Sequence, residues 1–325
     1  MNHLDKIRAR ARKSLRKIVL PEGDEPRVVE AAIRVKKEGI ADPILLGASG
    51  GSGLEMVDPR TSPHIDKMAA KFYELRKSKG ISEEQAKDTL LRDRVYYAAL
   101  MVRLGMADGF VAGAAHTTSN VARAAIHCME IDRTARVVSS SFLIMLDDKS
   151  FGEDGLLVFA DCGIVPDPSA KQMAGIAISS AGLLRSLLGV EPRVAMLSYS
   201  TKGSAKGDLV DKVREATELA KKKEKGLIID GEMQVDSALI PDVAKIKCPK
   251  SPVGGKANVL IFPNLDSGNI AYKLIQRIAG ARVVGPLLQG LKQPCSDLSR
   301  GCGVDEIVDA ITATAARAQT AKGSA

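Results

Sequence analysis

Short apolar runs alternate with stretches of helical periodicity along most of the chain. Residues 18–20 form the first run, and residues from about 25 to 37 then repeat apolar positions at helical spacing. Apolar runs bounded by turn residues are typical of buried strands, whereas longer periodic stretches favour amphipathic helices. The pattern therefore predicts strands at residues 18–20, 43–47, 109–113, 136–140, 156–160, 193–197, 227–230 and 259–262.

This alternation of buried strands with helices predicts an α/β fold with mostly parallel sheets. A chain of 325 residues, 45% of them hydrophobic, is long enough for two domains of ordinary size. No change of composition marks a boundary between them. The stretch from Ala48 to Gly53 is rich in glycine and serine, and we interpret it as a surface loop.

The composition argues against a nucleic-acid-binding protein. Aromatic residues make up only 3% of the chain and tryptophan is absent, whereas proteins that bind single-stranded nucleic acid stack bases on aromatic side chains. The net charge of +8 favours phosphate-rich partners. Its positive residues are scattered apart from two short runs, at 8–17 and 221–223, which we interpret as solvated helix faces.

The cysteine pattern and the N-terminus bear on metal binding and on location. The five cysteines form no C-x-x-C pair and have no histidine at metal-ligand spacing, so we expect no metal site. An odd number of cysteines fits free thiols in a reducing compartment. The basic N-terminus lacks the apolar run of a secretory signal, and no apolar stretch reaches transmembrane length. We therefore expect a soluble, cytoplasmic protein without a membrane partner.

The segment from Ser299 to Glu306 is the strongest candidate for chemistry. It places a hydroxyl, a cation and two carboxylates within eight residues, next to two glycines. Gly303 is a suitable helix N-cap, and apolar positions continue at helical spacing over residues 307–311. A helix start exposes unpaired N–H groups and a partial positive charge, so this segment suits a phosphate or an oxyanion.

Several motifs give the chain a resemblance to the phosphate acetyltransferases, or phosphotransacetylases, of the phosphate acetyl/butyryltransferase family. The motifs follow one another in the family's order and extend over nearly the whole chain. They are LPEG at residues 20–23, GAAH at 113–116, SYSTKGSAK at 198–206, DGEMQVD at 230–236, SPV at 251–253, FPNLDSGN at 262–269 and DLSRGCGVDE at 297–306.

The resemblance implies an architecture as well as an activity. It implies two αβα domains like those of isocitrate and isopropylmalate dehydrogenases, with the active site in a cleft between them and a homodimeric assembly. On this chain the first domain is expected to comprise residues 1–136 and 297–325, and the second residues 137–296. The Ser299 segment is then expected at the cleft, where ligand sites tend to form. The stretch at 48–53 is shorter here than in family members.

The implied reaction is the reversible transfer of acetyl between acetyl phosphate and coenzyme A. The thiol of coenzyme A needs a base when it attacks, and the carbonyl oxygen needs a hydrogen-bond donor for its growing negative charge. By resemblance, Ser299 stabilises this oxyanion and Arg300 binds the phosphate or the carbonyl oxygen. The family's base is usually an aspartate seven residues after the serine. Here that position is Glu306, which we assign as the base, with Asp305 mainly supporting the helix start.

Further candidates concern the binding of phosphate groups. Arg76 and Arg123 match the family's anion-binding arginines, although either is also compatible with an exposed helix charge. Ser200 and Lys202 lie in a loop between a strand and a helix, where backbone and side chains are able to hold a phosphate. His116 follows a glycine, and we keep both a substrate-binding role and a structural hydrogen-bonding role open for it. The resemblance implies coenzyme A as a substrate and no metal in the chemical step.

Three other functions compete with this interpretation. A phosphate butyryltransferase shares fold and mechanism, and the sequence does not locate the walls of an acyl pocket. A metal- and NAD-dependent decarboxylating dehydrogenase shares the architecture, but the chain lacks G-x-G-x-x-G after its first strand and a trio of aspartates spaced for Mg²⁺. A non-catalytic binding protein for phosphate or nucleic acid is compatible with the pI near 9.2, but not with the scattered basic residues.

Overall fold

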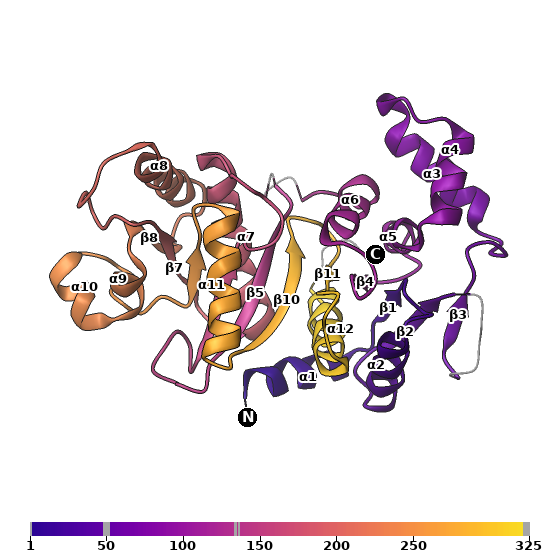
Figure 1. The fold of residues 1–325 in the computed structure, drawn as a ribbon, viewed down its shortest axis with the longest axis horizontal. Coiled ribbons are helices and arrows are strands. Elements are labelled where there is room, and N and C mark those ends of the chain that lie inside the picture. The colour runs from indigo at the N-terminus through magenta and orange to yellow at the C-terminus, as the bar shows by residue number, and fades with distance from the viewer. Residues whose placement is uncertain (1, 48–52, 133–134, 136, 321–325) are drawn as a thin grey trace. The chain divides into compact units, whose positions relative to one another are not determined.

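The computed structural model describes residues 2–47, 53–132, 135 and 137–320 (Figure 1). The chain divides into two compact units, Met1–Ile131 with Leu291–Ala325, and Asp132–Gly290. The predicted domain crossings near residues 136 and 296 lie within a few residues of these bounds and stay a prediction. The predicted loop at 48–53 falls outside the described residues except at Gly53.

The first unit contains a sheet of five strands that are all parallel to their neighbours. Because the strands are parallel, their carboxyl ends lie at one edge of the sheet, where loops carry binding groups in α/β proteins. In sheet order the strands are β3 (Glu55–Val57), β2 (Asp42–Leu46), β1 (Lys17–Leu20), β4 (Gly109–Ala112) and β11 (Cys295–Asp297).

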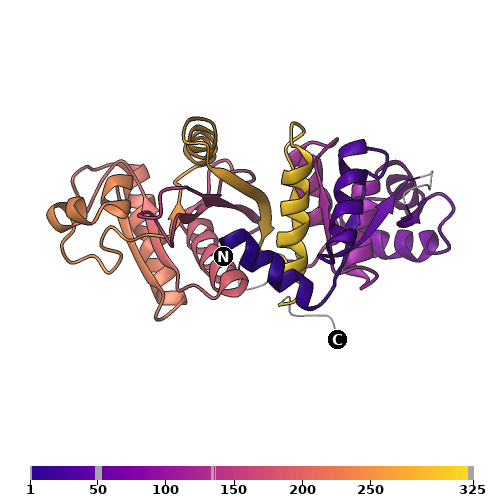
Figure 2. The same cartoon turned by 90° about the horizontal axis from the view of Figure 1, so that it is seen from below.

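The helices of the first unit cover this sheet, and the first and last helices of the chain pack against each other (Figure 2). The amide of Gln319 strengthens this contact by donating to the carbonyl oxygens of Arg10 and Ala11 at 2.9 and 3.0 Å. The helices are α1 (His3–Lys13), α2 (Pro26–Lys37), α3 (Ile65–Arg76), α4 (Glu83–Arg92), α5 (Arg94–Arg103), α6 (Thr118–Cys128) and α12 (Val304–Ala318), with a 3₁₀ turn η1 (Lys77–Lys79).

The second unit contains a mixed sheet. Its strands, in sheet order, are β10 (Arg282–Gln289), β5 (Ser139–Met145), β6 (Leu156–Ala160), β9 (Val259–Ile261), β7 (Arg193–Leu197) and β8 (Ile228–Met233). β5 runs antiparallel to both of its neighbours in this list, and the remaining pairs are parallel. The helices are α7 (Ala170–Leu188), α8 (Asp208–Lys223), α9 (Val235–Leu239), α10 (Pro241–Lys247) and α11 (Leu265–Ile278).

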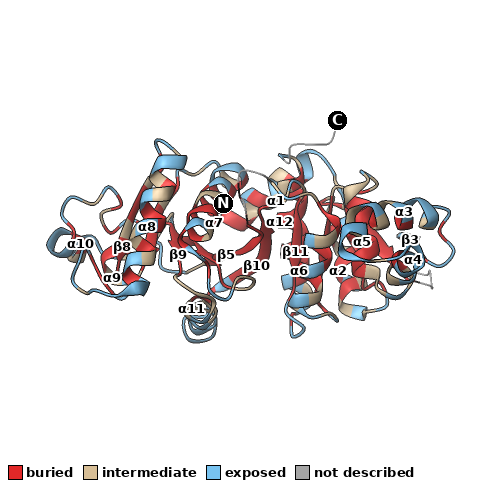
Figure 3. Ribbon diagram, turned by 90° about the horizontal axis from the view of Figure 1, so that it is seen from above, coloured by how far each residue is buried: buried red, intermediate tan, exposed pale blue. Residues whose placement is uncertain are grey.

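The second unit has an apolar core that includes aromatic side chains, and one of its helices is largely exposed. Aromatic side chains form part of the core, with the rings of Phe159 and Phe262 at a centroid distance of 5.1 Å. In contrast, Gly268 is the only buried residue of α11, and most of this helix is coloured as exposed or intermediate in Figure 3. Among the described residues, no helix combines the length and the hydropathy needed to cross a membrane.

The predicted fold class, α/β with mostly parallel strands, is confirmed. The predicted strand at 136–140 is wrong at its start, because β5 begins at Ser139 and extends to Met145. Its extension beyond Ser140 was missed because Ser139, Ser140 and Ser141 interrupt the apolar pattern; they are fully buried although they are polar. Their hydroxyls bond to Gln289 and Asp161, so they occupy a strand interior that an apolar pattern does not reveal.

Candidate active site

Three loops of the first unit meet at the carboxyl edge of its sheet. They follow β1, β4 and β11 and carry Glu22, the residues 113–116, and the residues 298–303 respectively. Hydrogen bonds described below join these loops to one another. The LPEG, GAAH and DLSRG motifs, which are far apart in the sequence, therefore form one local structure.

The carboxylate of Glu22 organises the loop after β4. It accepts hydrogen bonds from the backbone N–H groups of four consecutive residues, Gly113, Ala114, Ala115 and His116, at 2.7–3.1 Å. The Nδ1 atom of His116 lies 2.8 Å from the same carboxylate. Burial acts to raise the pKa of Glu22, but these hydrogen bonds outweigh it and hold the pKa below its usual value. The Glu22 carboxylate in turn raises the pKa of His116.

These contacts bear on the two roles left open for His116. The imidazole takes part in a hydrogen bond that fixes the loop, as the structural interpretation expects. Its side chain is also about one-third exposed, at 32%, and it lines a cavity of about 500 Å³. Its role in substrate binding stays a prediction.

Gly113 is needed where the loop after β4 meets the end of β11. Its φ of +118° is a conformation that side chains rarely adopt. A Cβ at this position would also overlap Asp297 Oδ1 and would lie 2.6 Å from the backbone nitrogen of Leu298. The backbone of the GAAH loop is therefore in direct contact with the residues immediately before Ser299.

Arg27, at the start of α2, joins two of the loops. Its Nη1 donates to the carbonyl oxygens of Cys302 and Arg300 at 2.6 and 3.1 Å, and its Nη2 donates to that of Ala114 at 3.2 Å. Its Nε bonds to Glu25 at 2.8 Å. Nothing in the sequence pattern around Arg27 pointed to this role, because its partners lie far away along the chain.

Ser299 and Arg300 occupy an exposed turn at the end of this local structure. The hydroxyl of Ser299 accepts a hydrogen bond from the backbone N–H of Gly301 at 3.3 Å, as a turn serine does. Both residues are exposed. Both side chains are therefore able to reach a substrate, and their catalytic roles stay predictions.

The two acidic residues that follow make different contacts. The carboxylate of Glu306 accepts a hydrogen bond from the backbone N–H of Gly303 at 2.8 Å, which completes the predicted helix start of α12. The carboxylate of Asp305 pairs with Arg34 of α2 at 2.5 Å and is 72% exposed. The two carboxylates thus have different partners: Glu306 caps its own helix start, and Asp305 pairs with α2.

The positive charges of Arg76 and Arg123 both influence one histidine of the first unit, His127. Burial lowers the pKa of His127, and the positive charges of Arg76 and Arg123 lower it further. The Nδ1 atom of His127 is 3.1 Å from the hydroxyl of Tyr96. The end of α3 and the middle of α6 thus place two cations near one imidazole, an arrangement that favours an anion.

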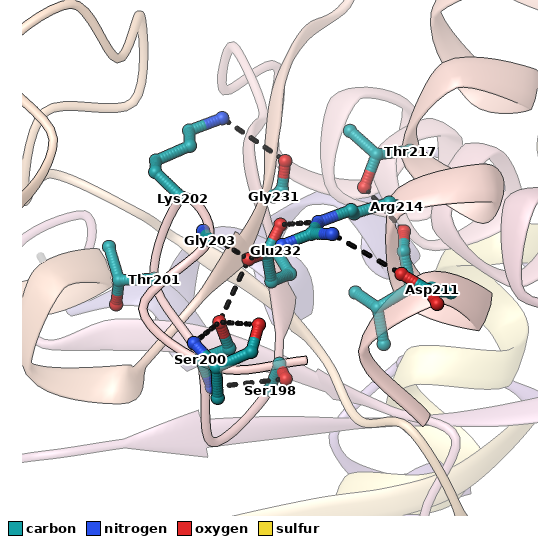
Figure 4. Close-up of polar contacts among 12 residues, drawn as sticks. Ser198, Ser200, Thr201, Lys202, Gly203, Asp211, Arg214, Thr217, Gly231 and Glu232 are labelled. Atoms are coloured by element: carbon teal, nitrogen blue, oxygen red, sulfur yellow. Dashed lines mark hydrogen bonds and ion pairs between the residues drawn. The ribbon is translucent and has the colours of Figure 1, made fainter. Parts of the chain in front are cut away.

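Ser200 and Lys202 belong to the second unit, where each already has a partner (Figure 4). The hydroxyl of Ser200 donates to the Glu232 carboxylate at 2.9 Å, and the ammonium of Lys202 pairs with Asp230 at 2.5 Å. Arg214 also pairs with Glu232, at 2.9 Å. Burial acts to raise the pKa of Glu232, but the hydrogen bonds from Arg214 and its other partners lower it to about 2.

This second-unit cluster fixes the loop that carries the SYSTKG motif. The backbone N–H of Gly203 also donates to Glu232, at 2.8 Å, and Lys202 has a φ of +48°. Sequence reasoning missed Glu232 and Arg214; the DGEMQVD motif was a signal for the first. Among the described residues, no group of histidine, cysteine, aspartate or glutamate side chains has a geometry that would hold a metal ion.

A family model described as Phosphate acetyl/butaryl transferase matches residues 3–315. This chain belongs to that family. The phosphate acetyltransferase of Thermoanaerobacterium thermosaccharolyticum is 50% identical over 329 residues, which cover 98% of this chain and 100% of that protein. The phosphate acetyltransferase of Acetivibrio thermocellus is 46% identical over 332 residues, which cover 99% and 100% of the two chains.

A comparison with a solved structure supports membership of the same family. The crystal structure of a phosphotransacetylase from Streptococcus pyogenes matches with a TM-score of 0.91 at 39% identity, and the match covers 98% of each chain. The family predicted from the sequence motifs is therefore confirmed, and the protein is an acyltransferase of the phosphate acetyl/butaryl transferase family.

Proposed function

We propose that this protein is a phosphate acetyltransferase that reversibly transfers acetyl between acetyl phosphate and coenzyme A. The observation that carries the proposal is the exposed Ser299–Arg300 turn, held at the carboxyl edge of a parallel sheet and directly before a helix start. The relatives described above carry the acetyl name over their full length. The butyryl alternative has no such support among them.

In the proposed reaction, the sulfur of coenzyme A attacks the carbonyl carbon of acetyl phosphate. The Glu306 carboxylate accepts the thiol proton, and the Ser299 O–H donates to the carbonyl oxygen as it becomes an oxyanion. Arg300 binds the phosphate group, which leaves with the electrons of the broken C–O bond. The products are acetyl-CoA and inorganic phosphate. The location of Glu306 on the first turn of α12, three residues after the cap, supports its assignment as the base.

The remaining candidates are proposed to bind the phosphate groups of the substrates. Arg76 and Arg123 share one neighbourhood around His127, which suits a phosphate of coenzyme A. His116 lines the cavity together with Glu22. Ser200 and Lys202 are proposed to contact a phosphate through the loop that Glu232 fixes, and Lys202 would then exchange part of its contact with Asp230 for the substrate.

The proposed step uses only side chains of this chain, so we propose that it requires no metal. Treatment with a chelator followed by desalting should leave at least half of the initial thioester formation. A loss that is restored by a divalent cation would contradict this part of the proposal. The five cysteines, all free and buried, are compatible with the proposed cytoplasmic location.

We also propose a homodimer, formed through the exposed face of α11. Ile270, Leu274 and Ile278 of this helix are 58, 51 and 81% exposed. They are spaced four residues apart, so they form one apolar stripe along the helix. Such a stripe is costly to leave in water and fits a second copy of the same helix. Replacing Leu274 and Ile278 by glutamate should convert a dimer to a monomer in sedimentation experiments.

The direct test of the function is thioester absorbance with coenzyme A and a series of acyl phosphates. We expect acetyl phosphate to give the highest kcat/KM, with propionyl phosphate lower and butyryl phosphate lower still. The absence of thioester with every acyl phosphate would overturn the proposal. A preference for butyryl phosphate would transfer the assignment to a phosphate butyryltransferase, and reduction of a nicotinamide cofactor would indicate a dehydrogenase.

A further inference from the structure

Asp297 is a buried carboxyl group for which the proposed reaction has no use. It is the last residue of β11 and lies two residues before Ser299. Its exposed fraction is 0%. It also touches the GAAH loop, because a Cβ on Gly113 would overlap its Oδ1 atom. The side chain is therefore enclosed between the two loops that shape the Ser299 turn.

Neither carboxyl oxygen of Asp297 makes a hydrogen bond of normal geometry to the described residues. The backbone N–H groups of residues 113–116, in the loop that Asp297 touches, all donate to Glu22 and not to Asp297. The Thr118 hydroxyl and the Leu298 N–H act to lower the pKa of Asp297. Burial outweighs them, and together with the Glu22 charge it raises this pKa to about 7.

We propose that Asp297 is a positioning residue that keeps its proton in the active enzyme, and that its ionisation displaces the Ser299–Arg300 turn. The reason is geometric. An anion at this place would have no cation among the described neighbours, would stand beside the Glu22 carboxylate, and would compete for the four N–H groups that hold the GAAH loop. Since both loops touch Asp297, relief of that repulsion requires one of them to move.

The charges around Asp297 are consistent with this assignment. From the loop after β1 it faces the Glu22 carboxylate, which itself interacts with His116. From its own strand it faces the thiol of Cys295, whose pKa is raised by burial to about 12, so this group adds no charge at neutral pH. From the start of α6 it faces the neutral hydroxyl of Thr118. No cation among these described neighbours offsets a negative charge on Asp297.

The substitution Asp297→Asn tests the proposal because asparagine keeps the shape of a protonated aspartic acid and cannot ionise. The effect on turnover rests on the proposed acetyltransferase activity. The ratio of kcat in the variant to kcat in the wild type is measured at each pH, so that titration of the substrates cancels. We expect a ratio near one at about pH 6 and a rise to about tenfold at about pH 8, since each unit above a pKa of about 7 reduces the protonated fraction about tenfold.

A second experiment, on the stability of the folded protein, does not depend on turnover. The pKa of Asp297 is about 7 in the folded protein and about 3.9 in an unfolded chain. A raised folded pKa gives stability that is complete below the unfolded pKa and is lost as the pH rises to the folded pKa. The unfolding temperature of Asp297→Asn relative to wild type should therefore increase from about pH 4 to about pH 7 and then level off. The infrared band of a protonated carboxyl group should titrate in the wild type and be missing in the variant.

Asp161 provides a matched control. It is also a buried aspartate at the carboxyl end of a strand, β6, with 2% exposure. Unlike Asp297, it accepts hydrogen bonds from Ser140 and from the backbone N–H groups of residues 163–165. Asp161→Asn replaces an acceptor by a donor, so it should lower the unfolding temperature at neutral pH, where Asp297→Asn should raise it.

The outcomes separate this proposal from the proposed function. A ratio that stays flat over the whole pH range, or a folded Asp297→Asn variant without activity at about pH 6, would overturn the positioning role. An Asp297→Asn variant that does not fold at about pH 6 would contradict the assignment of a proton to Asp297. So would an infrared carboxyl band that persists in the variant. If the wild type forms no thioester at all, the proposed function fails, while the unfolding and infrared measurements still decide where the proton resides.

Discussion

The Nη1 atom of Arg27 lies 2.6 Å from the carbonyl oxygen of Cys302. The same atom is 3.1 Å from the carbonyl oxygen of Arg300. Two backbone groups on either side of Gly301 are thus held by one guanidinium from α2. This cation fixes the position of the turn that carries Ser299, although it is itself far from that turn in the sequence.

We therefore predict that Arg27→Lys lowers kcat by roughly tenfold or more while the KM for coenzyme A changes little. An ammonium cannot reproduce the fork that binds several carbonyl oxygens at once, and loss of a charge-assisted hydrogen bond has an effect of this size. Arg34→Lys, on the same helix, is the control because Arg34 binds only exposed or partly exposed carboxylates. Equal kinetics for the two variants would contradict the role of Arg27.

The three proposed substrate-binding arginines should differ in the kinetic constant that each one affects, kcat or KM. Arg300→Ala should lower kcat by roughly 10–150-fold, because it removes a charge-assisted contact next to the proposed oxyanion serine. Arg76→Ala and Arg123→Ala should instead raise the KM for coenzyme A, since both lie around His127 on α3 and α6. Steady-state kinetics in both substrates measure the two effects. Wild-type constants in three folded variants would remove all three from the site.

The sequence predicted those parts of this structure that depend on neighbouring residues. The start of α12 at a Gly303 cap with Glu306 three residues later is a local pattern, and it is present. The roles of Glu22 and Arg27 were not predictable in this way, because the loop residues that they hold lie 91–94 and 87–275 residues away. Strand β11 was also missed. Its three residues include a serine and an aspartate, so no apolar run marks it.

Glu232 in the second unit should make stability depend on pH at the acidic end. Its folded pKa of about 2 lies below the value of about 4.3 for an unfolded chain. A lowered folded pKa gives stability that is present above the unfolded pKa and is lost as the pH falls towards the folded one. Acid unfolding should therefore begin below about pH 4, and Glu232→Gln should weaken this dependence.

At neutral pH the same substitution should reduce the free energy of unfolding by about 2 kcal/mol, because Glu232 is buried and accepts from Arg214, Ser200 and Gly203. Glu218→Gln is a suitable control, since Glu218 is 61% exposed and pairs only across one helix turn with Lys221. Denaturant unfolding at two pH values measures both variants. A similar loss in the control would show that the buried contacts of Glu232 are not responsible.

The assignment of the base can be tested with two variants of neighbouring residues. Glu306→Gln keeps an oxygen that is able to accept from the Gly303 N–H, so the helix start should remain intact. It removes the proton acceptor, and kcat should fall by roughly 10²–10⁴-fold. Asp305→Asn removes the exposed pair with Arg34, which should cost less than about 1 kcal/mol and leave turnover nearly unchanged.

A folded Glu306→Gln variant with nearly normal turnover would indicate that Glu306 only caps α12. If Asp305→Asn abolishes turnover and Glu306→Gln is nearly normal, the two roles are reversed. If neither substitution matters, His116 becomes the next candidate, since Glu22 already raises its pKa and its ring is partly exposed.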